Sequence, residues 1–365
     1  GQQHKDGHWI FDLEADVTIP SEYVFLQKFL GKSNPSRESH IAKYLLAKQN
    51  NNGSWPLYHD GPGNVSATVK AYFALKLLGY SVDSDFMVRA KTWVLENGGA
   101  ETANVFTRIT LAMFGQLNWK TVPAMPVEIM YLPNWWFFNL NRVSYWSRCV
   151  IVPLLIIFAK KPVVELERGF SISELFYSDP RKIKKLDFFR TKHPLKNGFI
   201  LLDRILKLAD PLVPKFIRNR ALRLAESWLR EHSKGSGGIG AIFPAMSNAI
   251  VAYKLLGTSD SDEDMNRQIN AMEGLIIEGS ETTYCQPCVS PIWDTCLTIS
   301  ALSESGVPTD DPRIRNSIKW LLNKQVFVGG DWSVHAPRLK PGGWAFQYEN
   351  DKYPDVDDTG MVLMG

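Results

Sequence analysis

Residues 69–85 read VKAYFALKLLGYSVDSD, and two later stretches of the chain repeat this pattern. They are NAIVAYKLLGTSDSDED at 248–264 and TCLTISALSESGVPTDD at 295–311. Each one is an apolar helical pattern that ends in a glycine and passes into a short acidic loop. Glycine suits the position after a helix, because it adopts a left-handed backbone without steric cost. The predicted helix ends are marked by Gly79, Gly257 and Gly306.

An earlier copy, EYVFLQKFLG, ends at Gly31, so the copies recur with a period of about fifty residues. A second helical pattern follows in each unit, as in VRAKTWVLENGG at 88–99 and IRNSIKWLLNKQ at 314–325. Periods of this size are typical of helical arrays and closed toroids. Because sustained alternation of apolar and polar residues is rare, the sequence predicts a predominantly α-helical protein built from helix pairs.

A second repeat combines Gln, Gly and Trp. It occurs as QQHKDGHW ending at Trp9, as YLLAKQNNNGSW at 44–55 and as WLLNKQVFVGGDW at 320–332, with a degenerate copy at 228–240. The glycine turns the chain, the tryptophan can pack back over the helix end, and the glutamine can hydrogen-bond backbone groups. Chance recurrence is the alternative in a chain with 12 Trp, but three similar copies favour a repeat.

The composition limits the class of protein. The 365 residues are 45% apolar with a net charge of +3, which suits a large core and lacks the basic bias of a nucleic-acid binder. The 12 Trp, 12 Tyr and 19 Phe fill a core in the plainest interpretation, or else line an apolar pocket or face a cation. Cys285 and Cys288 have CxxC spacing, but the sequence offers no suitable second pair for a zinc site.

Residues 160–220 interrupt the repeat. The stretch 182–220 is basic and leucine-rich, and Pro211 and Pro214 end or kink its helix. Such a helix fits a membrane interface, but a helix packed on its own domain explains the pattern equally well. The apolar run CVIVPLLIIFA at 149–159 is interpreted as a core helix, because crossing a bilayer needs about 20 residues.

A cluster of carboxylates stands at 353–360, which read YPDVDDTG. Asp355, Asp357 and Asp358 crowd into four positions, and like charges this close repel one another. Taken by itself, the cluster fits a solvated turn or helix N-cap, a Mg²⁺ or Ca²⁺ site, or an acid that is held protonated.

The Gln-Gly-Trp repeats and PDVDDTG together resemble the squalene–hopene cyclase family, the class II triterpene cyclases. Further similar segments are IPSEYVF (19–25), NVFTRITLAMFG (104–115), MPVEIMYLP (125–133), GGIGAIFPAM (237–246), QPCVSPIWDT (286–295) and KPGGWAFQYEN (340–350). The resemblance implies an all-α fold of two α/α barrels, one inserted into the other. Residues 14–287 would form the inserted barrel with a membrane-contacting segment, and residues 1–13 with 288–365 an incomplete catalytic barrel.

The resemblance also implies the chemistry of the acid cluster, without a metal or cofactor. Protonating an alkene needs a neutral carboxylic acid in a dry site, and burial and crowding both keep a proton bound. By resemblance Asp357 is the proton donor, while Asp355 and Asp358 orient it and stabilise the carboxylate left behind. Class I terpene synthases instead hold Mg²⁺ with a DDxxD spacing, and oxidosqualene cyclases carry a shorter acidic motif. An epoxide is easier to open than an alkene is to protonate. The larger cluster of three aspartates therefore favours a polyene substrate that carries no epoxide.

Several residues match the family's large apolar cavity, where aromatic faces stabilise the travelling positive charge. Phe346 and Trp293 match aromatics near the early cations, and Asp294 matches a residue that supports the acid cluster or the cations. Trp146 matches a substrate-positioning tryptophan, which we expect at the far end of the cavity. For any one aromatic alone, plain core packing would be the better interpretation.

Termination of the reaction needs a base or water. Glu22 matches a family glutamate that polarises water at the far end, although a surface carboxylate at a helix start is the alternative. Pro244 matches a family proline in that region, and Phe243 stands where some relatives carry Gln. Thr110 falls where some relatives place Trp. These departures leave the product, an alkene or an alcohol, and the substrate length open.

The resemblance favours the interfacial interpretation of 196–216. The expected membrane-contacting residues are Phe199, Ile200, Leu201, Leu206, Leu208, Leu212 and Val213. The protein is expected to lie on one leaflet, on the cytoplasmic side of a bacterial-type membrane, without crossing it. The expected partners are this membrane surface and a squalene-like polyprene, with a homodimer allowed and nucleic acid excluded.

The sequence stops at MVLMG (361–365), whereas the family continues well beyond the acid motif. The resemblance therefore implies that a missing C-terminal half is needed to complete the active site, and we expect this chain alone to be inactive. Whether the chain is a fragment or is completed by a second chain stays open at this point.

The leading function is that of a cyclase acting on squalene to give hopene or hopanol. A cyclase of a shorter or aryl-capped prenyl substrate is one alternative, and a class II diterpene diphosphate cyclase is another. A diphosphate substrate should need a polar, basic pocket, whereas the residues that match the cavity are apolar and aromatic. The non-enzymatic alternative is an α/α-toroid binding module, which would bind a partner without converting a polyprene.

Overall fold

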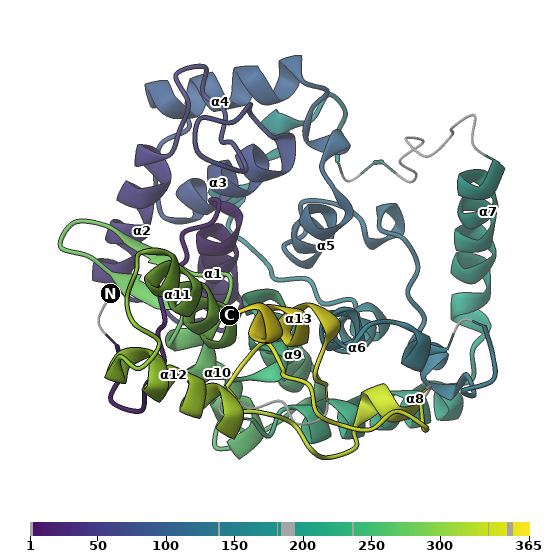
Figure 1. The fold of residues 1–365 in the computed structure, drawn as a ribbon. Helices are drawn as coiled ribbons and strands as arrows, with labels where there is room; N and C mark the ends of the chain where they lie inside the picture. The colour runs from purple at the N-terminus through teal and green to yellow at the C-terminus, as the bar shows by residue number, and fades with distance from the viewer. Residues whose placement is uncertain are drawn as a thin grey trace.

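Helices dominate the structure, which confirms the predicted all-α class. The computed structural model describes residues 3–137, 139–180, 182–183, 194–235, 237–334, 336–348 and 353–365. Their strands form a single hairpin, β1 (Ile276–Glu278) and β2 (Thr283–Cys285), which pair antiparallel with Ile276 opposite Cys285. In Figure 1, α4 lies at the top of the molecule, α7 at the right and α8 at the bottom, while the last helix, α13, lies near the middle.

The α-helices fall into three runs along the chain. Helices α1 to α5 are Thr18–Phe29, Pro35–Ala47, Val65–Leu77, Asp85–Glu96 and Val105–Met113. Helices α6 to α10 are Tyr145–Lys160, Pro194–Ala209, Lys215–His232, Phe243–Leu256 and Glu263–Glu273, and α11 to α13 are Pro291–Glu304, Pro312–Asn323 and Val356–Met364. The short 3₁₀ helices are η1 Ala100–Thr102, η2 Trp119–Thr121, η3 Val127–Tyr131, η4 Leu140–Arg142, η5 Arg168–Phe170, η6 Ser173–Leu175, η8 Asp210–Leu212, η9 Ile239–Ala241 and η10 Asp331–Val334.

Capping residues set many of these boundaries. The side chain of Asn64, the N-cap of α3, accepts a hydrogen bond from the N–H of Ala67, and Asn34 and Asp262 cap α2 and α10 in the same way. The predicted helix ends are confirmed, because the glycines expected there have positive φ angles. These are Gly31, Gly79, Gly257 and Gly306.

The Gln-Gly-Trp turn after α2 closes on the end of that helix. Trp55 is fully buried, and its Nε1–H donates to the carbonyl oxygen of Leu45 at 2.6 Å. Gln49 Nε2 donates to the carbonyl oxygen of Gly53 at 2.8 Å. The packing role expected for both side chains is confirmed in this copy.

The copy after α12 differs from the sequence prediction. The tryptophan that packs back is Trp344, whose Nε1–H donates to Leu321 O at 2.6 Å, just as Trp55 does in the other copy. Gln325 Nε2 donates to Gly342 O at 2.6 Å. The prediction that this copy ends at Trp332 was wrong, because the chain makes a longer excursion and returns to the helix end only at the glycines before Trp344.

The interior is built around α3 and α9. Every residue from Ser66 to Leu77 is buried in α3, which contacts α1 and α4. Helix α9 contacts α1, α6 and α10. The apolar run at 149–159 lies in α6, where most side chains are buried, so its interpretation as a core helix is confirmed.

The buried side chains form two separate clusters. The larger cluster extends from Val17 to Cys285. The smaller one lies among α11, α12 and α13 and consists of Ile292, Cys296, Ile299, Ile314, Trp320, Leu321, Trp344 and Met361. The acid motif therefore sits on a helix whose inner face belongs to the smaller cluster.

Helix α7 stands at the side of the molecule (Figure 1). Asp203 on this helix accepts a hydrogen bond from the N–H of Ala124 at 2.6 Å, which ties α7 to the segment before η3. Among the described residues, no helix combines the length and apolar character that crossing a bilayer requires.

Candidate active site

Asp355 is the N-cap of α13. Its backbone is extended, and its Oδ1 accepts a hydrogen bond from the N–H of Asp358 at 2.9 Å. This bond satisfies one of the N–H groups that the first turn of a helix leaves free. The first of the three aspartates therefore has a defined local role, which places the other two on the first helical turn, where the helix dipole favours negative charge.

A second set of contacts fixes this turn to the Gln-Gly-Trp repeat. Thr359 Oγ1 donates to Asp355 O at 2.6 Å and accepts a hydrogen bond from the N–H of Trp344 at 3.1 Å. In the earlier repeat, Thr68 Oγ1 likewise donates to Asn64 O and accepts from the N–H of Trp55. The motif DVDDT thus occupies the position at the start of α13 that NVSAT (64–68) occupies at the start of α3.

Asp358 is the buried member of the cluster. Its side chain is 1% exposed, and its Oδ1 has no hydrogen-bond partner among the described residues. Burial, a side-chain hydrogen bond with Asp355 and the charges of Asp355 and Asp357 raise its pKa to about 8, against a smaller opposing effect from a hydrogen bond with Trp293. At neutral pH this carboxyl group is therefore a neutral acid.

Asp357 lies on the same turn but is exposed in this structure. Successive helical residues point about 100° apart, so the turn that buries Asp358 against α11 directs Asp357 away from it. The resemblance assigned the proton donor to Asp357 and an orienting role to Asp358, and the exposure of Asp357 in this structure does not test that assignment. The structure brings the three aspartates together, and the side chain that it buries is Asp358.

Two aromatic residues adjoin the cluster. Trp146, on the first turn of α6, points its Nε1–H at Asp355 Oδ2 over 3.3 Å. The rings of Trp146 and Phe346 meet edge to face, with their centroids 5.3 Å apart. The expectation that Trp146 lies at the far end of the cavity was wrong, because the start of α6 packs against the segment that leads into α13.

Trp293 and Asp294 are neighbours on the first turn of α11 but have different partners. The Trp293 indole hydrogen-bonds Asp358. Asp294 accepts hydrogen bonds from the N–H of Phe11 at 2.9 Å and from Ser290 Oγ at 3.1 Å. Burial raises the pKa of Asp294, and these two bonds oppose the rise. The hydrogen bond from Phe11 to Asp294 thus ties the N-terminal segment to the start of α11.

The predicted far-end residues lie on helices of the larger cluster. Glu22 on α1 forms an ion pair with Lys70, a buried side chain on α3. Glu22 is therefore not the surface carboxylate of the alternative interpretation. Phe243 is fully buried at the start of α9, and its N–H donates to Pro287 O at 2.8 Å, while Pro244 is half-buried beside it.

The sequence interpretation missed Lys70. It lies in an apolar stretch, VKAYFALKLL, and a buried cation in such a helix needs a paired carboxylate. The helical pattern alone could have drawn attention to it, because a lysine on a fully apolar helix has no solvated face. Its partner, however, comes from a segment 48 residues away in sequence and is defined only by packing.

A buried arginine braces the segment before the acid motif. Arg148 on α6 forms an ion pair with Asp331 at 3.0 Å, and its guanidinium lies 5.9 Å from the ring centre of Tyr353. Tyr353 also stacks on Tyr145 at 4.9 Å. A polar hollow of about 480 Å³ beside them is lined by Asn141, Arg142, Arg148, Asp331, Trp332 and Tyr353.

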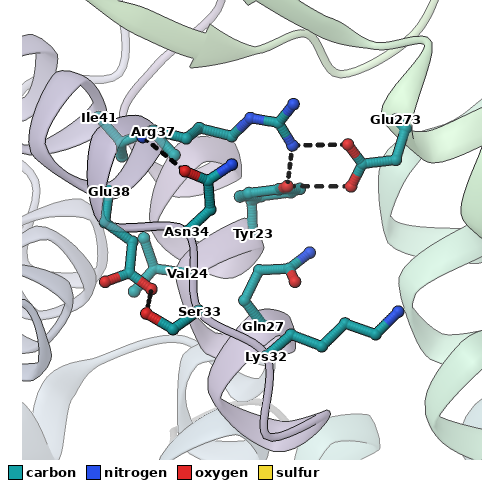
Figure 2. A pocket seen from close by; sticks show the side chains of 10 residues that line it. All are labelled: Tyr23, Val24, Gln27, Lys32, Ser33, Asn34, Arg37, Glu38, Ile41 and Glu273. Atoms are coloured by element: carbon teal, nitrogen blue, oxygen red, sulfur yellow. Dashed lines mark hydrogen bonds and ion pairs between the residues drawn. The ribbon is translucent and has the colours of Figure 1, made fainter.

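Another pocket, of about 340 Å³, lies away from the acid cluster. Figure 2 shows Arg37 of α2 reaching Glu273 of α10 beside the ring of Tyr23 of α1. Arg37 donates to Tyr23 Oη at 2.7 Å and to Glu273 at 2.6 Å, and Tyr23 donates to Glu273 at 2.9 Å. None of the ten lining residues belongs to the predicted site, and this network of matched charges links three helices.

The described residues contain no group of three or more His, Cys, Asp or Glu side chains arranged to hold a metal ion. Cys285 and Cys288 carry free thiols, and burial raises the pKa of Cys288 to about 11. The geometry of the acid cluster instead provides a neutral carboxyl group next to aromatic rings, which can donate a proton to an apolar substrate.

Fold and site together define an all-α protein with a buried carboxylic acid at the start of a helix. The family model for the squalene-hopene cyclase N-terminal domain matches residues 1–281, and that for the squalene-hopene cyclase C-terminal domain matches residues 289–365. The chain belongs to the squalene–hopene cyclase family.

Similar proteins carry names from within this family. The chain is 45% identical to a squalene–hopene cyclase of Bradyrhizobium diazoefficiens over 100% of its length and 56% of the relative. It is 42% identical to that of Zymomonas mobilis, again over 100% of this chain and 56% of the relative. A dammaradiene synthase of Dryopteris crassirhizoma is 34% identical over 100% of this chain and 53% of the relative. The chain thus spans about half the length of these curated relatives.

Proposed function

We propose that this chain is part of a class II terpene cyclase that converts squalene to hopene or hopanol. One observation carries the proposal: Asp358, buried beside Trp293 in a cluster of three aspartates, is a neutral acid at neutral pH. A solvated turn would leave all three carboxylates ionised. The similar proteins named squalene–hopene cyclase support squalene as the substrate.

In the proposed mechanism, Asp357, which is exposed in this chain, is covered once the rest of the protein completes the catalytic barrel, binds a proton in that dry site and delivers it to the terminal alkene. Asp355 and the protonated Asp358 orient it and stabilise the carboxylate that it leaves. The faces of Trp293, Phe346 and Trp146 then stabilise the positive charge as the chain folds, in a site without water. At the other end, Glu22 with its partner Lys70 polarises the water or accepts the proton that ends the reaction.

The proposed architecture is a pair of α/α barrels. Residues 14–287 form the inserted barrel, and residues 1–13 with 288–365 contribute to the catalytic one, which the rest of the protein completes. The division of buried side chains into a cluster from Val17 to Cys285 and one from Ile292 to Met361 supports this arrangement. The substrate cavity would then lie between the barrels, where the acid motif faces the aromatic residues.

The proposed membrane contact is made by α7 and η8, on one leaflet at the cytoplasmic side of the membrane. Most of the predicted residues are exposed, with Leu212 80% accessible, while Ile200, Leu206 and Val213 are half-buried. The segment 194–223 carries seven Lys or Arg against two Asp, which favours an anionic lipid surface.

The test uses the protein in its natural full length, assayed with squalene in detergent by gas chromatography. Replacing Asp357→Asn should lower kcat by at least about 10²-fold without lowering the melting temperature, because the proton donor is lost. Asp310→Asn, at an exposed position, is the matched control and should retain activity. Retained cyclisation in Asp357→Asn would contradict the assignment of the donor.

Further measurements separate the alternatives. If Asp358→Asn abolishes turnover while Asp357→Asn retains it, Asp358 is the donor. Turnover of geranylgeranyl diphosphate without turnover of squalene would favour a diterpene cyclase, and binding of polyprenes without conversion would favour a binding module. The ratio of alkene to alcohol product then reports on termination near Glu22.

A further inference from the structure

The loop that follows η3 exposes three consecutive aromatic side chains. Trp135 is 75%, Trp136 45% and Phe137 72% exposed, and the two indole rings meet edge to face with centroids 5.5 Å apart. We call residues 132–137 the aromatic loop. Large aromatic residues normally gain stability from burial, so three exposed in a row mark an interaction surface.

The backbone of this loop is held by a buried amide. Asn139 is 1% exposed, and its Nδ2 donates to Asn134 O at 2.9 Å and to Trp136 O at 2.6 Å. The N–H of Trp136 also donates to Pro133 O at 2.9 Å, which closes a turn. These bonds fix the backbone in a conformation that directs the rings outward, so the exposure belongs to the folded structure.

The aromatic loop adjoins the surface proposed to contact the membrane. Tyr131, at the end of η3, donates its hydroxyl to Ile217 O at 3.1 Å, and Glu128 pairs with Arg218 at 3.0 Å. Both partners lie at the start of α8, directly after Phe216, which is itself exposed. The same Arg218 pairs with Asp210 of η8 at 2.8 Å. These contacts join η3, η8 and the start of α8, and the aromatic loop follows η3 directly along the chain.

The chemistry of this surface fits a bilayer interface better than a protein partner. Tryptophan favours the headgroup region, because its ring is apolar while its N–H can still find a polar partner. Phe216 and the aromatic loop supply apolar rings, and the exposed Lys215 and Arg220 beside them supply positive charge. A surface that combines exposed apolar rings with basic side chains is typical of a segment that lies in a membrane interface.

We propose that the aromatic loop is a second membrane anchor, which inserts Trp135 and Phe137 into the headgroup region beside α7. This inference rests on the proposed membrane contact of α7 and deepens it. With two separate anchors, the protein would be held at a defined tilt, and the lipid contact would not depend on α7 alone.

The test measures binding of the full-length protein to sucrose-loaded vesicles of phosphatidylcholine and phosphatidylglycerol by sedimentation. The double variant Trp135→Ser/Phe137→Ser should bind about tenfold more weakly, because it loses the two rings that insert into the headgroup region of the membrane. Leu208→Ser/Leu212→Ser in the α7 region should weaken binding to a similar degree. The control Leu57→Ser/Tyr58→Ser, which removes exposed apolar side chains from the loop before α3, should bind as the natural protein does.

A conservative variant sharpens the result. Trp135→Tyr keeps an amphipathic ring and should retain binding, whereas a merely structural role of the indole would lower the melting temperature of both Trp135 variants. If the loop variant binds normally while the α7 variant does not, the aromatic loop is covered by another part of the protein and the inference is overturned. Normal binding of both variants overturns it together with the α7 contact.

Cyclase activity in detergent separates this inference from the proposed function. The loop variants should cyclise squalene in detergent at the natural rate, because the loop does not belong to the acid site. If the natural protein lacks cyclase activity but the loop variant still loses vesicle binding, the anchor stands and the proposed function fails. If the natural protein has cyclase activity and the loop variant binds vesicles normally, the proposed function stands and the anchor fails.

Discussion

Asp357 and Asp358 are adjacent on the first turn of α13, yet only one of them is buried. The side chain of Asp358 meets Trp293 on α11, whereas Asp357 is exposed. Burial disfavours the charged form of a carboxyl group, and the neighbouring Asp355 adds to this effect. A difference of one helical position therefore separates a buried acid that stays protonated at neutral pH from an exposed side chain.

The raised pKa of Asp358 predicts how stability depends on pH. Its pKa is about 8 in the folded protein, against 3.8 for an ordinary aspartate side chain, so the folded state holds one more proton between these limits. The free energy of unfolding should fall as the pH rises through this window, by up to about 1.4 kcal/mol per pH unit from this group. Above the folded pKa the contribution is lost completely.

Asp358→Asn should reduce this dependence, because the amide does not titrate. Urea unfolding at several pH values between about 4 and 8 measures the slope for both proteins. Asp310→Asn, at an exposed position, is the control and should keep the slope of the natural protein. An identical slope in Asp358→Asn would show that this carboxyl group is ionised throughout the window.

At this scale the sequence predicted the cluster but not its geometry. Crowding of three carboxylates in four positions indicated a shared proton. The resemblance named Asp357 as the proton donor, but the sequence could not show which aspartate is buried, because which face of α13 is covered depends on α11. Trp146 was misplaced for a related reason: a motif match identifies a residue, but its position relative to Asp355 follows from how α6 packs.

At the scale of elements, the repeats decide where the site forms. The first turn DVDDT of α13 has the same hydrogen bonds as the first turn NVSAT of α3, with Thr359 in place of Thr68 and Trp344 in place of Trp55. The acid motif is thus an ordinary capped turn of the repeat in which two small residues are replaced by aspartates. The repeat positions the carboxylates without requiring a special backbone.

The ion pair between α1 and α3 provides a second prediction. Lys70 is buried, so removing the charge of Glu22 leaves an ammonium without its partner. Glu22→Gln should lower the free energy of unfolding by about 3 kcal/mol, in the range observed when one partner of a buried ion pair is removed. Urea denaturation followed by circular dichroism measures this loss.

The double variant Glu22→Gln/Lys70→Met is the control for this prediction. Because the uncompensated charge is gone, most of the lost stability should return. The exposed pair Asp85 and Arg89 on α4 offers a comparison, since Asp85→Asn should cost less than about 1 kcal/mol. Equal losses in Glu22→Gln and Asp85→Asn would contradict the structural role given to the buried pair.

For the whole molecule, the two clusters of buried side chains suggest regions of unequal stability. The smaller cluster, which carries the acid motif, includes Trp344, whose Nε1–H donates to Leu321 O. Hydrogen bonds such as that of Trp9 N–H to Thr295 Oγ1, at 3.0 Å, connect this cluster to the N-terminal segment. Because the two clusters are separate, a defect in the smaller cluster should first increase local unfolding of that cluster.

Trp344→Ala tests this division. Removing a buried tryptophan should cost about 3–5 kcal/mol and leave a cavity among α11, α12 and α13. Hydrogen exchange followed by mass spectrometry should show faster exchange in α11–α13, while α6 and α9 keep their protection. The matched variant Trp55→Ala, in the larger cluster, should instead increase exchange around α2 and α3. A uniform increase in both variants would contradict two separately stable regions.

The sequence by itself determined the helical class, the repeat, the helix ends at glycines and the presence of an acid cluster with its aromatic neighbours. These features depend on local periodicity, on the backbone freedom of glycine and on residue types, which are legible along the chain. The tertiary structure decided which aspartate is buried, that Trp344 rather than Trp332 closes the second repeat, that Trp146 lies beside Asp355, and that Glu22 pairs with Lys70. Each of these depends on contacts between segments far apart in sequence, because burial and pairing are set by packing and not by local pattern.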